Sequence, residues 1–313
     1  MDLKRIQYLI QVAEFGSFSK AATVVGIAQP ALGRQVQKLE EDCGVRLLYR
    51  HGRGVSLTPE GEKLRERVRP LMRQLDAITS DMQDERSSPS GLVMIGMTPT
   101  ICNMLGLRLI TAVQKEYPKL RVNVISGYSG YIHEWLMEAR LDLAILHDAR
   151  RSQHVAVEHL ADAKLSLVSS PSLLNPVEAK QSVLALRDLD GLPLVLPTQN
   201  HGLRRTLELA ASHAGIALNV QYEVDTLELM KAIVLAGYAH TVLALPAVQS
   251  EIKAGQLIAR RISQPDVETR LVLAKSANRP LTRAVRIIEQ ETKNAFHQIP
   301  PDALFDLGLK VAI

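Results

Sequence analysis

Aromatic residues, cysteines and long apolar runs are scarce in this chain of 313 residues. Phe, Trp and Tyr make up only 4% of it, too few for a base-stacking platform that reads single-stranded nucleic acid. The two cysteines, Cys43 and Cys102, cannot build a disulfide framework or a cysteine-rich zinc site, and they fit a reducing compartment. No run approaches the roughly 20 apolar residues of a membrane span, and the interrupted N-terminal pattern does not fit a signal peptide. We therefore expect a cytoplasmic protein without a membrane partner.

An excess of charge of one sign is also missing. The 37 Lys and Arg residues against 33 Asp and Glu residues give a net charge of only +4, so bulk charge alone does not indicate a nucleic-acid partner. The 46% apolar and 22% charged residues exclude a disordered or collagen-like chain. At roughly 150 residues per domain, the length predicts about two globular domains.

Familiar catalytic patterns are incomplete in the sequence. Residues 133–137 (HEWLM) begin like a zinc-protease motif, but Met137 stands where the second metal-binding histidine must be. Residues 127–131 (GYSGY) lack the second glycine of a nucleophile elbow. No glycine-rich nucleotide fingerprint and no phosphate loop with a lysine occurs. We therefore expect no enzyme, no catalytic residue, no metal and no cofactor.

Periodicity divides the chain into zones. Short helical patterns that end in a basic hairpin are followed by one long helical pattern, which Ser87-Ser88-Pro89-Ser90-Gly91 interrupts as a linker does. From Leu92 onward, short apolar runs alternate with amphipathic helices, which predicts βα units and a mostly parallel sheet. We expect a reader domain at residues 1–58 and a linker helix at residues 59–88. A two-lobed α/β domain is expected at residues 91–298, followed by an apolar tail at residues 299–313 that packs on a neighbouring subunit.

The first zone has the pattern of a helix-turn-helix. A second helix from Lys20 to Val25 can be capped by Ser17 or Ser19, and a third helix has Pro30 near its first turn. At about 100° per residue the third helix has one narrow buried stripe and one polar face. The stripe comprises Leu32, Val36, Leu39 and Cys43, and the face comprises Pro30, Arg34, Gln37, Lys38 and Glu41. An ordinary three-helix bundle with a solvated face fits the same residues.

A basic hairpin follows and favours a winged reader of duplex DNA. Residues 45–50 are predicted as a strand, 51–54 as a tight turn and 55–57 as the returning strand, with Arg50, His51 and Arg53 at the tip. Residues 1–58 hold 8 Lys and Arg against 5 Asp and Glu, a net charge of +3. A basic wing beside a basic recognition helix is typical of phosphate and groove contacts. Solvated hairpin charge is the alternative.

The long helical pattern from Thr58 predicts a dimer. Its apolar positions are spaced 4, 3, 4, 3 and 4 residues apart, a heptad seam of roughly 28 Å at 1.5 Å per residue. The predicted dimerisation residues are Leu64, Val68, Leu71, Leu75, Ile78 and Met82. Packing of the seam on the chain's own effector domain is the alternative. Pro70 removes one helical hydrogen bond, so we expect a kink there.

Residues 16–62, from Gly16-Ser17-Phe18-Ser19-Lys20-Ala21-Ala22 to Leu57-Thr58-Pro59-Glu60-Gly61, resemble the LysR-type transcriptional regulators. The C-terminal part is similar to the subgroup of the nitrogen assimilation control regulators, through residues 135–136, 140–144 and 201–205. Ala28 and Gly33 depart from this pattern where serines are common. The resemblance implies a dimer or tetramer on an interrupted inverted repeat near a promoter. It also implies a C-terminal domain like type 2 periplasmic binding proteins, with a small-molecule cleft between two lobes.

The expected DNA-binding residues lie at the second and third helices and on the hairpin: Ser17, Ser19, Gln29, Pro30, Ala31, Arg34, Gln37, Lys38, Arg50 and Arg53. Strands are expected at residues 92–97, 121–126, 141–147, 165–169, 194–197, 220–224, 241–245 and 270–274.

Two of these strands end alike, at residues 96–100 and 196–200, and each leads into a helix. Backbone N–H groups at a helix N-terminus suit an anion, and two similar exits suggest two lobes that face one crevice. The expected effector-binding residues are Thr98, Pro99, Thr100, Ser126, Ser129, His147, Thr198 and Gln199. The alternative is that these hydroxyls merely cap their own helices.

The sequence thus predicts a ligand-responsive transcriptional regulator that binds double-stranded promoter DNA, a small-molecule effector for which an anion is one candidate, and a second copy of itself. The alternative is a solute-binding or enzymatic α/β protein with an accessory helical N-terminus.

Overall fold

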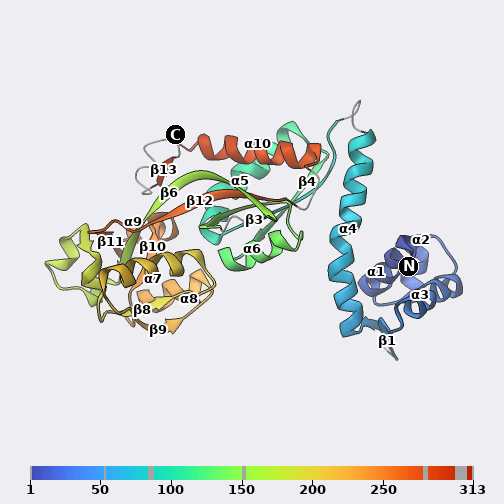
Figure 1. Ribbon diagram of the computed structural model, residues 1–313, viewed down its shortest axis with the longest axis horizontal. Coiled ribbons are helices and arrows are strands. Elements are labelled where there is room, and N and C mark those ends of the chain that lie inside the picture. Colours follow the sequence, from blue (N-terminus) through green and yellow to red (C-terminus); the bar gives the residue numbers. More distant parts are fainter. Residues whose placement is uncertain are drawn as a thin grey trace. The chain divides into compact units, whose positions relative to one another are not determined.

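The computed structural model describes residues 2–52, 54–83, 88–149, 153–277, 281–299 and 309–311 (Figure 1). The chain divides into two compact units, Met1–Thr79 and Ser80–Ile313. Within the described ranges, no helix has the length and apolarity needed to cross a membrane.

The first unit is a helix-turn-helix followed by a hairpin and a long helix. Its elements are α1 (Leu3–Phe15), α2 (Phe18–Val25), α3 (Gln29–Cys43), β1 (Leu48–His51), β2 (Gly54–Leu57) and α4 (Pro59–Gln83). Of the two possible caps for α2, Ser17 is the one used: its hydroxyl accepts the N–H of Lys20, and Gly26 ends the helix in the left-handed conformation. The predicted winged helix-turn-helix is therefore confirmed.

The first hairpin strand is shorter than predicted. It begins at Leu48 rather than Val45, because residues 45–47 are tied to the end of α3. The N–H of Val45 donates to the Glu40 carbonyl, and the N–H of Leu47 donates to the Glu40 carboxylate at 2.7 Å. The polar side chain of Glu40 thus holds the wing against the recognition helix.

A single apolar core stabilises the first unit. The predicted stripe on α3 is buried at Leu32, Val36 and Leu39, and Cys43 packs beside it. The core also includes Val68 of α4, with Leu64 and Met72 of the same helix packed against it. At roughly 25 cal/mol per Å² of buried apolar surface, this shared core is the main force that joins the three helices to the wing.

The first lobe of the second unit contains parallel strands covered by helices. Its strands are β3 (Gly91–Met97), β4 (Leu120–Ser126), β5 (Leu143–His147) and β12 (Glu268–Ser276), and its helices are α5 (Pro99–Glu116), α6 (Ser129–Met137) and α10 (Arg283–His297). Strand β3 pairs in parallel with β4 and β5, whereas β12 runs antiparallel to β5. Helices α5 and α10 lie on one face of this sheet and α6 on the other (Figure 1).

The second lobe is built from shorter elements. Its strands are β7 (Val183–Ala185), β8 (Pro193–Leu196), β9 (Asn219–Glu223), β10 (Thr241–Ala244) and β11 (Ile258–Ser263). Its α-helices are α7 (Gly202–Ala214), α8 (Leu227–Leu235) and α9 (Gln249–Lys253), with single 3-10 turns at Pro171–Leu173, Glu178–Lys180, Leu186–Leu189 and Leu245–Ala247. Strands β8 and β9 are parallel, as βα units require.

One long strand, β6 (Val155–Ser169), belongs to both lobes. Residues 155–164 pair with β12, and residues 165–169 pair with β10 and β11, all antiparallel. The sheet is therefore mixed, which corrects the expectation of a mostly parallel one. The sequence predicted only residues 165–169 of β6, because charged side chains interrupt the apolar pattern before them.

The described part of the C-terminal tail forms a strand that the sequence did not predict. Residues Leu309–Val311 form strand β13, which pairs antiparallel with Ala161–Ala163 of the same chain. The described segment of the tail thus extends the chain's own sheet. The remainder of the tail lies outside the described residues.

Candidate functional site

The outer face of α3 is polar and exposed. Arg34, Gln37 and Lys38 are exposed, as are Gln29 and Pro30 at the start of the helix, and Ala31 is half-buried. Ala28 at the N-cap position makes no side-chain capping bond, and Pro30 occupies the first turn, where a missing N–H costs little. The helix therefore offers long basic and amide side chains to a partner, while its opposite face holds the core.

The acidic residues near the end of α3 are used within the unit. Glu40 accepts two backbone N–H groups of the wing segment, and Asp42 forms an ion pair of 2.9 Å with Arg5 of α1. The carboxylate of Glu41 accepts a hydrogen bond of 3.1 Å from Gln37. These contacts leave the Arg34 and Lys38 side of the helix with the positive charge that contact with phosphate requires.

The wing packs on the helix-turn-helix through Arg50. The guanidinium carbon of Arg50 lies 4.9 Å from the centre of the Phe18 ring, a cation–π contact that fixes the wing beside α2. At the tip, His51 lies 3.2 Å from the Ser56 hydroxyl. Ser19 is exposed, whereas the hydroxyl of Ser17 is engaged in capping. Arg53, also predicted to bind DNA, lies outside the described residues.

Helix α4 divides the predicted seam into two parts. Leu64 and Val68 pack against the core of the first unit, and Val68 is only 6% exposed. Leu71 and Leu75 are 53% and 46% exposed. The helix continues through residue 70, and the side chains of Ile78 and Met82 lie outside the described residues. The first unit itself therefore covers Val68. Neither the dimer seam nor the alternative, packing of the seam on the effector domain, predicted this contact.

A cavity, here called the inner cavity, opens between the two lobes of the second unit. Predicted effector residues that line it come from the first lobe: Thr98, Pro99, Thr100, Ser129 and His147. The second lobe contributes a mainly apolar wall: Pro197, His201, Leu203, Leu227, Met230, Leu243, Ala244, Pro246 and Ala247. The loop between β4 and α6 adds Tyr128, and β12 adds Thr269.

Two hydroxyl oxygens in this wall have no hydrogen-bond partner among the described residues. Thr98 is 5% exposed, and its Oγ1 neither caps α5 nor reaches another described protein group. The phenol oxygen of Tyr128 is equally buried and unpartnered. Since an unsatisfied buried hydroxyl costs free energy, such groups indicate a place that a ligand completes. The capping alternative is therefore wrong for Thr98.

Three predicted effector residues lie elsewhere. The Thr198 hydroxyl donates to both carboxylate oxygens of Asp225, at 3.1 and 2.9 Å, and its backbone N–H also donates to Asp225. Thr198 thus ties two strand exits of the second lobe together and does not line the inner cavity. Ser126 is exposed at the end of β4. Gln199 lines a neighbouring hollow instead.

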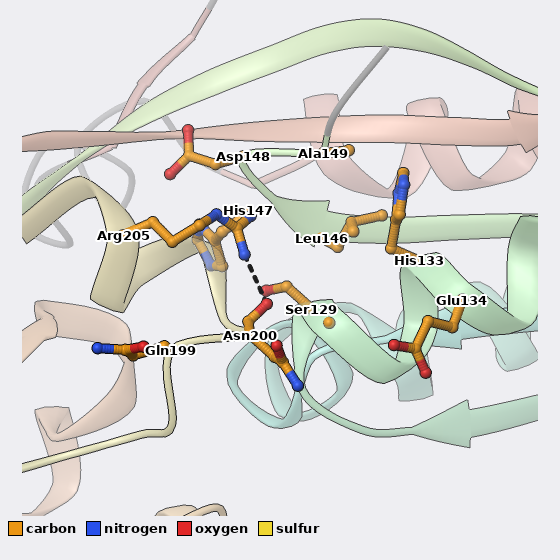
Figure 2. Close-up of a pocket in the computed structure, with 11 residues that line it drawn as sticks. Ser129, His133, Glu134, Leu146, His147, Asp148, Ala149, Gln199, Asn200 and Arg205 are labelled. Carbon is orange, nitrogen blue, oxygen red and sulfur yellow. Dashed lines mark hydrogen bonds between the residues drawn. The ribbon is translucent and has the colours of Figure 1, made fainter. Parts of the chain in front are cut away.

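That neighbouring hollow, here called the outer hollow, is the charged one (Figure 2). It shares Ser129 and His147 with the inner cavity, and its other polar walls are His133, Glu134, Asp148, Gln199, Asn200 and Arg205. Figure 2 shows His133 and Glu134 on α6 and Arg205 opposite them. The Nη1 of Arg205 donates to the Asn200 carbonyl at 2.5 Å. The outer hollow therefore provides charge of both signs, which the inner cavity does not.

His201 joins the two lobes beside the inner cavity. The N–H of Gly130 in α6 donates to His201 Nδ1 at 3.4 Å, and His201 Nε2 lies 3.1 Å from Asp225 Oδ1. The ring also lies 4.6 Å from that of Tyr128, centre to centre. Burial lowers the pKa of His201, while nearby Asp225 opposes that shift. The neutral ring is thus favoured, with Nδ1 free to accept the Gly130 N–H.

Comparison with known proteins now identifies the family. The chain matches the LysR substrate binding domain over residues 86–296 and the bacterial regulatory helix-turn-helix protein, lysR family, over residues 3–62. The chain belongs to the LysR family of transcriptional regulators. This assignment supports a transcriptional regulator over a solute-binding or enzymatic protein with an accessory helical N-terminus.

Relatives of this LysR-family regulator align along almost its whole length. The transcriptional regulator BbuR of Bordetella bronchiseptica is 28% identical over 92% of this chain and 88% of its own. The nitrogen assimilation regulatory protein nac of Klebsiella aerogenes is 27% identical over 93% of both chains. The DNA-binding transcriptional dual regulator OxyR of Escherichia coli is 26% identical over 100% of both.

Solved structures show the same fold. A full-length OxyR variant from Pseudomonas aeruginosa superposes with a TM-score of 0.68 at 23% identity, over 95% of each chain. Full-length CbnR in complex with its target DNA also gives 0.68, at 20% identity, over 94% of this chain and 100% of that one. The predicted reader domain, linker helix and two-lobed α/β domain are the architecture of the family.

Sequence reasoning about this LysR-family chain missed Tyr128, His201 and Asp225. Asp225 lies two residues after the end of β9, so the rule that polar groups gather at strand exits applied to it as well as to Thr198. His201 lay within a quoted family motif, but nothing in its spacing indicated a contact with Gly130. Tyr128 carried no local signal, because its role depends on the distant residues that bury it.

Proposed function

We propose that this LysR-family regulator binds duplex promoter DNA as a dimer, through α3 and the wing, and that a small molecule in the inner cavity controls that binding. The observation that carries this proposal is that one chain contains two features together. The first is an exposed basic helix beside a wing, and the second is a two-lobed domain whose cavity is lined by hydroxyls without a partner among the described residues. Phosphate contacts position such a reader and groove contacts specify the sequence. We place its action in the cytoplasm, where its DNA partner is.

We propose residues 1–58 as the reader, 59–88 as the linker and dimer helix, and 91–298 as the effector domain. The role is regulatory rather than catalytic, since the quoted enzyme motifs are incomplete. Among LysR subgroups, we propose kinship with the nitrogen assimilation control regulators. The support is the nac protein of Klebsiella aerogenes at 27% identity and the residues at 135–136, 140–144 and 201–205.

The control we propose works through the lobes. A ligand that contacts Thr98 in the first lobe and the wall around Met230 in the second favours one arrangement of the lobes over another. A ligand shifts an equilibrium only by its differential affinity for the two states. Because this ligand contacts both lobes, its affinity differs between the two arrangements of the lobes. The long strand β6, which pairs within both lobes, is the segment about which they are expected to turn.

The DNA surface is tested by Arg34→Ala in the full-length chain. We expect affinity for duplex DNA from upstream of the gene to fall about 10- to 100-fold if Arg34 contacts a base, equivalent to about 1–3 kcal/mol. If it contacts phosphate, the salt dependence of binding should flatten by about one unit of slope. Titration at several salt concentrations, by fluorescence anisotropy, separates the two.

Arg108→Ala is the matched control, because Arg108 is exposed on α5 in the second unit. It should bind DNA as the parent chain does. If Arg34→Ala keeps both the parent affinity and the parent salt slope, the proposed DNA surface is wrong.

A further inference from the structure

The walls of the inner cavity are uncharged. No Asp, Glu, Lys or Arg occurs among the described residues that line it. The groups that can titrate are Tyr128, His147 and His201, and burial keeps each of them in its neutral form. Burial raises the pKa of the Tyr128 phenol above its ordinary value, with Asp225 and Glu228 adding to the effect, and burial lowers the pKa of both histidines.

An ionised ligand would therefore be poorly matched to this site. Removing a carboxylate from water is costly unless a cation or a full set of donors replaces the water. The N-terminus of α5 beside Thr98 and Pro99 supplies a partial positive charge, but that alone compensates only a small part of the cost. Arg205 lines the outer hollow and not the inner cavity, and the guanidinium of buried Arg204 is held by Glu208 and the Pro197 carbonyl.

Hydrogen-bonding capacity is nevertheless present at two fixed points. The unpartnered Thr98 Oγ1 lies at the entrance to α5, where the N–H groups of the first turn have no helical acceptor. The unpartnered Tyr128 oxygen belongs to the loop before α6. Each hydroxyl can donate or accept, so a carbonyl, amide or alcohol group suits both. Between them the wall is apolar, with Ile101, Leu203 and Met230.

From these features we infer that the effector is an uncharged, largely apolar small molecule whose one or two polar groups bond to Thr98 and Tyr128. This inference rests on the proposed role of the inner cavity as the effector site and adds the chemical class of the ligand. It replaces the anion that the strand-exit pattern favoured, because that pattern could not reveal the apolar wall of the second lobe.

The test uses the full-length chain and pairs of probes that match in shape and differ in charge. The pairs are benzamide with benzoate, phenylacetamide with phenylacetate, and cyclohexanecarboxamide with cyclohexanecarboxylate. We expect an amide to raise the Tm by about 2 °C or more at millimolar concentration, with no rise from its carboxylate. If no amide raises the Tm, or if a carboxylate raises it and Arg205→Gln leaves that rise intact, the inference is overturned.

Thr98→Val and Tyr128→Phe preserve shape and remove only the hydroxyls. Each should weaken binding of the amide about tenfold or more, while Thr111→Val on the exposed side of α5 and Tyr238→Phe on the surface should not. Without ligand, Thr98→Val and Tyr128→Phe should keep or raise the Tm, since each removes a buried oxygen that lacks a partner. A ligand-free Tm that falls by more than about 4 °C in either variant overturns the inference, because the oxygen then bonds within the protein.

DNA binding separates this inference from the proposed function. If an amide binds in the inner cavity but leaves promoter affinity unchanged, regulation through the cavity fails while the ligand class stands. If carboxylates bind and alter promoter affinity, the ligand class fails while the proposed function stands.

Discussion

At the residue scale, His201 combines a structural contact with a titratable group. Its Nδ1 accepts the N–H of Gly130 from the other lobe, so protonation of that nitrogen removes the bond. Nearby Asp225 has a pKa below its ordinary value. Burial raises this pKa, but the hydrogen bonds from Thr198 lower it, and the lowering is the larger effect. The hydrogen bond between Gly130 and His201, which joins the two lobes, therefore depends on pH.

We therefore predict that the effector unit loses stability in mild acid. Because burial holds the pKa of folded His201 below its ordinary 6.5, the unfolded chain takes up the proton first as the pH falls. The free energy of unfolding should therefore decline as the pH drops below about 6.5, and His147 and His240, whose pKa values burial also lowers, should add to the decline. Denaturant titrations between pH 8 and 5 measure it.

His201→Asn tests the contribution of this one ring. Asparagine keeps an acceptor near the Nδ1 position and cannot take up a proton in this range. The variant should show a shallower decline than the parent chain. An identical slope in both would show that His201 is not among the groups responsible.

Two glycines give a second prediction at this scale. A Cβ at Gly202 would lie 2.6 Å from the His147 carbonyl oxygen of the other lobe, so something must shift. We expect Gly202→Ala to destabilise the second unit by about 1–3 kcal/mol, as overpacking does. Gly33→Ala is the matched control within α3: a Cβ there meets nothing within 4 Å, so it should stabilise the first unit by about 0.5–1 kcal/mol. Equal effects of the two in chemical denaturation would contradict this.

At the scale of elements, local patterns predicted most of the fold. The cap at Ser17, the stripe on α3 and the predicted strands depend on spacings of a few residues. The structure contains each of them, with small shifts at the ends except in β6, which begins ten residues earlier than predicted. What local spacing could not predict was pairing over long distances. The first ten residues of β6 carry His159, Asp162 and Lys164, so their alternation looks weak until β12 supplies the partner strand.

The same limit explains the mixed success at the site. Thr98, Thr100 and Ser129 could be predicted, because they directly follow strands or begin helices. Thr198 satisfied the same rule, yet it lies elsewhere, since its hydroxyl donates to Asp225 in the loop between β9 and α8. Which strand-exit hydroxyl faces a ligand and which bonds within the protein depends on the three-dimensional neighbours, which spacing does not give.

At the scale of the whole molecule, the proposed function requires two copies. A reader that recognises an inverted repeat must place two recognition helices about one helical turn of DNA apart, or a multiple of it. Helix α4 presents Leu71 and Leu75 to solvent, beyond the point where Val68 is covered by the core of its own reader unit. We therefore propose that self-association depends on the half of the seam that follows Val68.

The double variant Leu71→Glu with Leu75→Glu tests this proposal. Buried in a heptad seam, two carboxylates per chain would face their copies across the interface and cost far more than the apolar contacts they replace. We expect the dimer to dissociate at micromolar concentration in sedimentation velocity and promoter affinity to fall with it. The Tm of the first unit should stay unchanged, because both side chains are exposed in the single chain. Leu107→Glu, at a 78% exposed leucine of α5, is the control and should remain associated. A double variant that still sediments as the parent does would place the dimer interface on another surface of the chain.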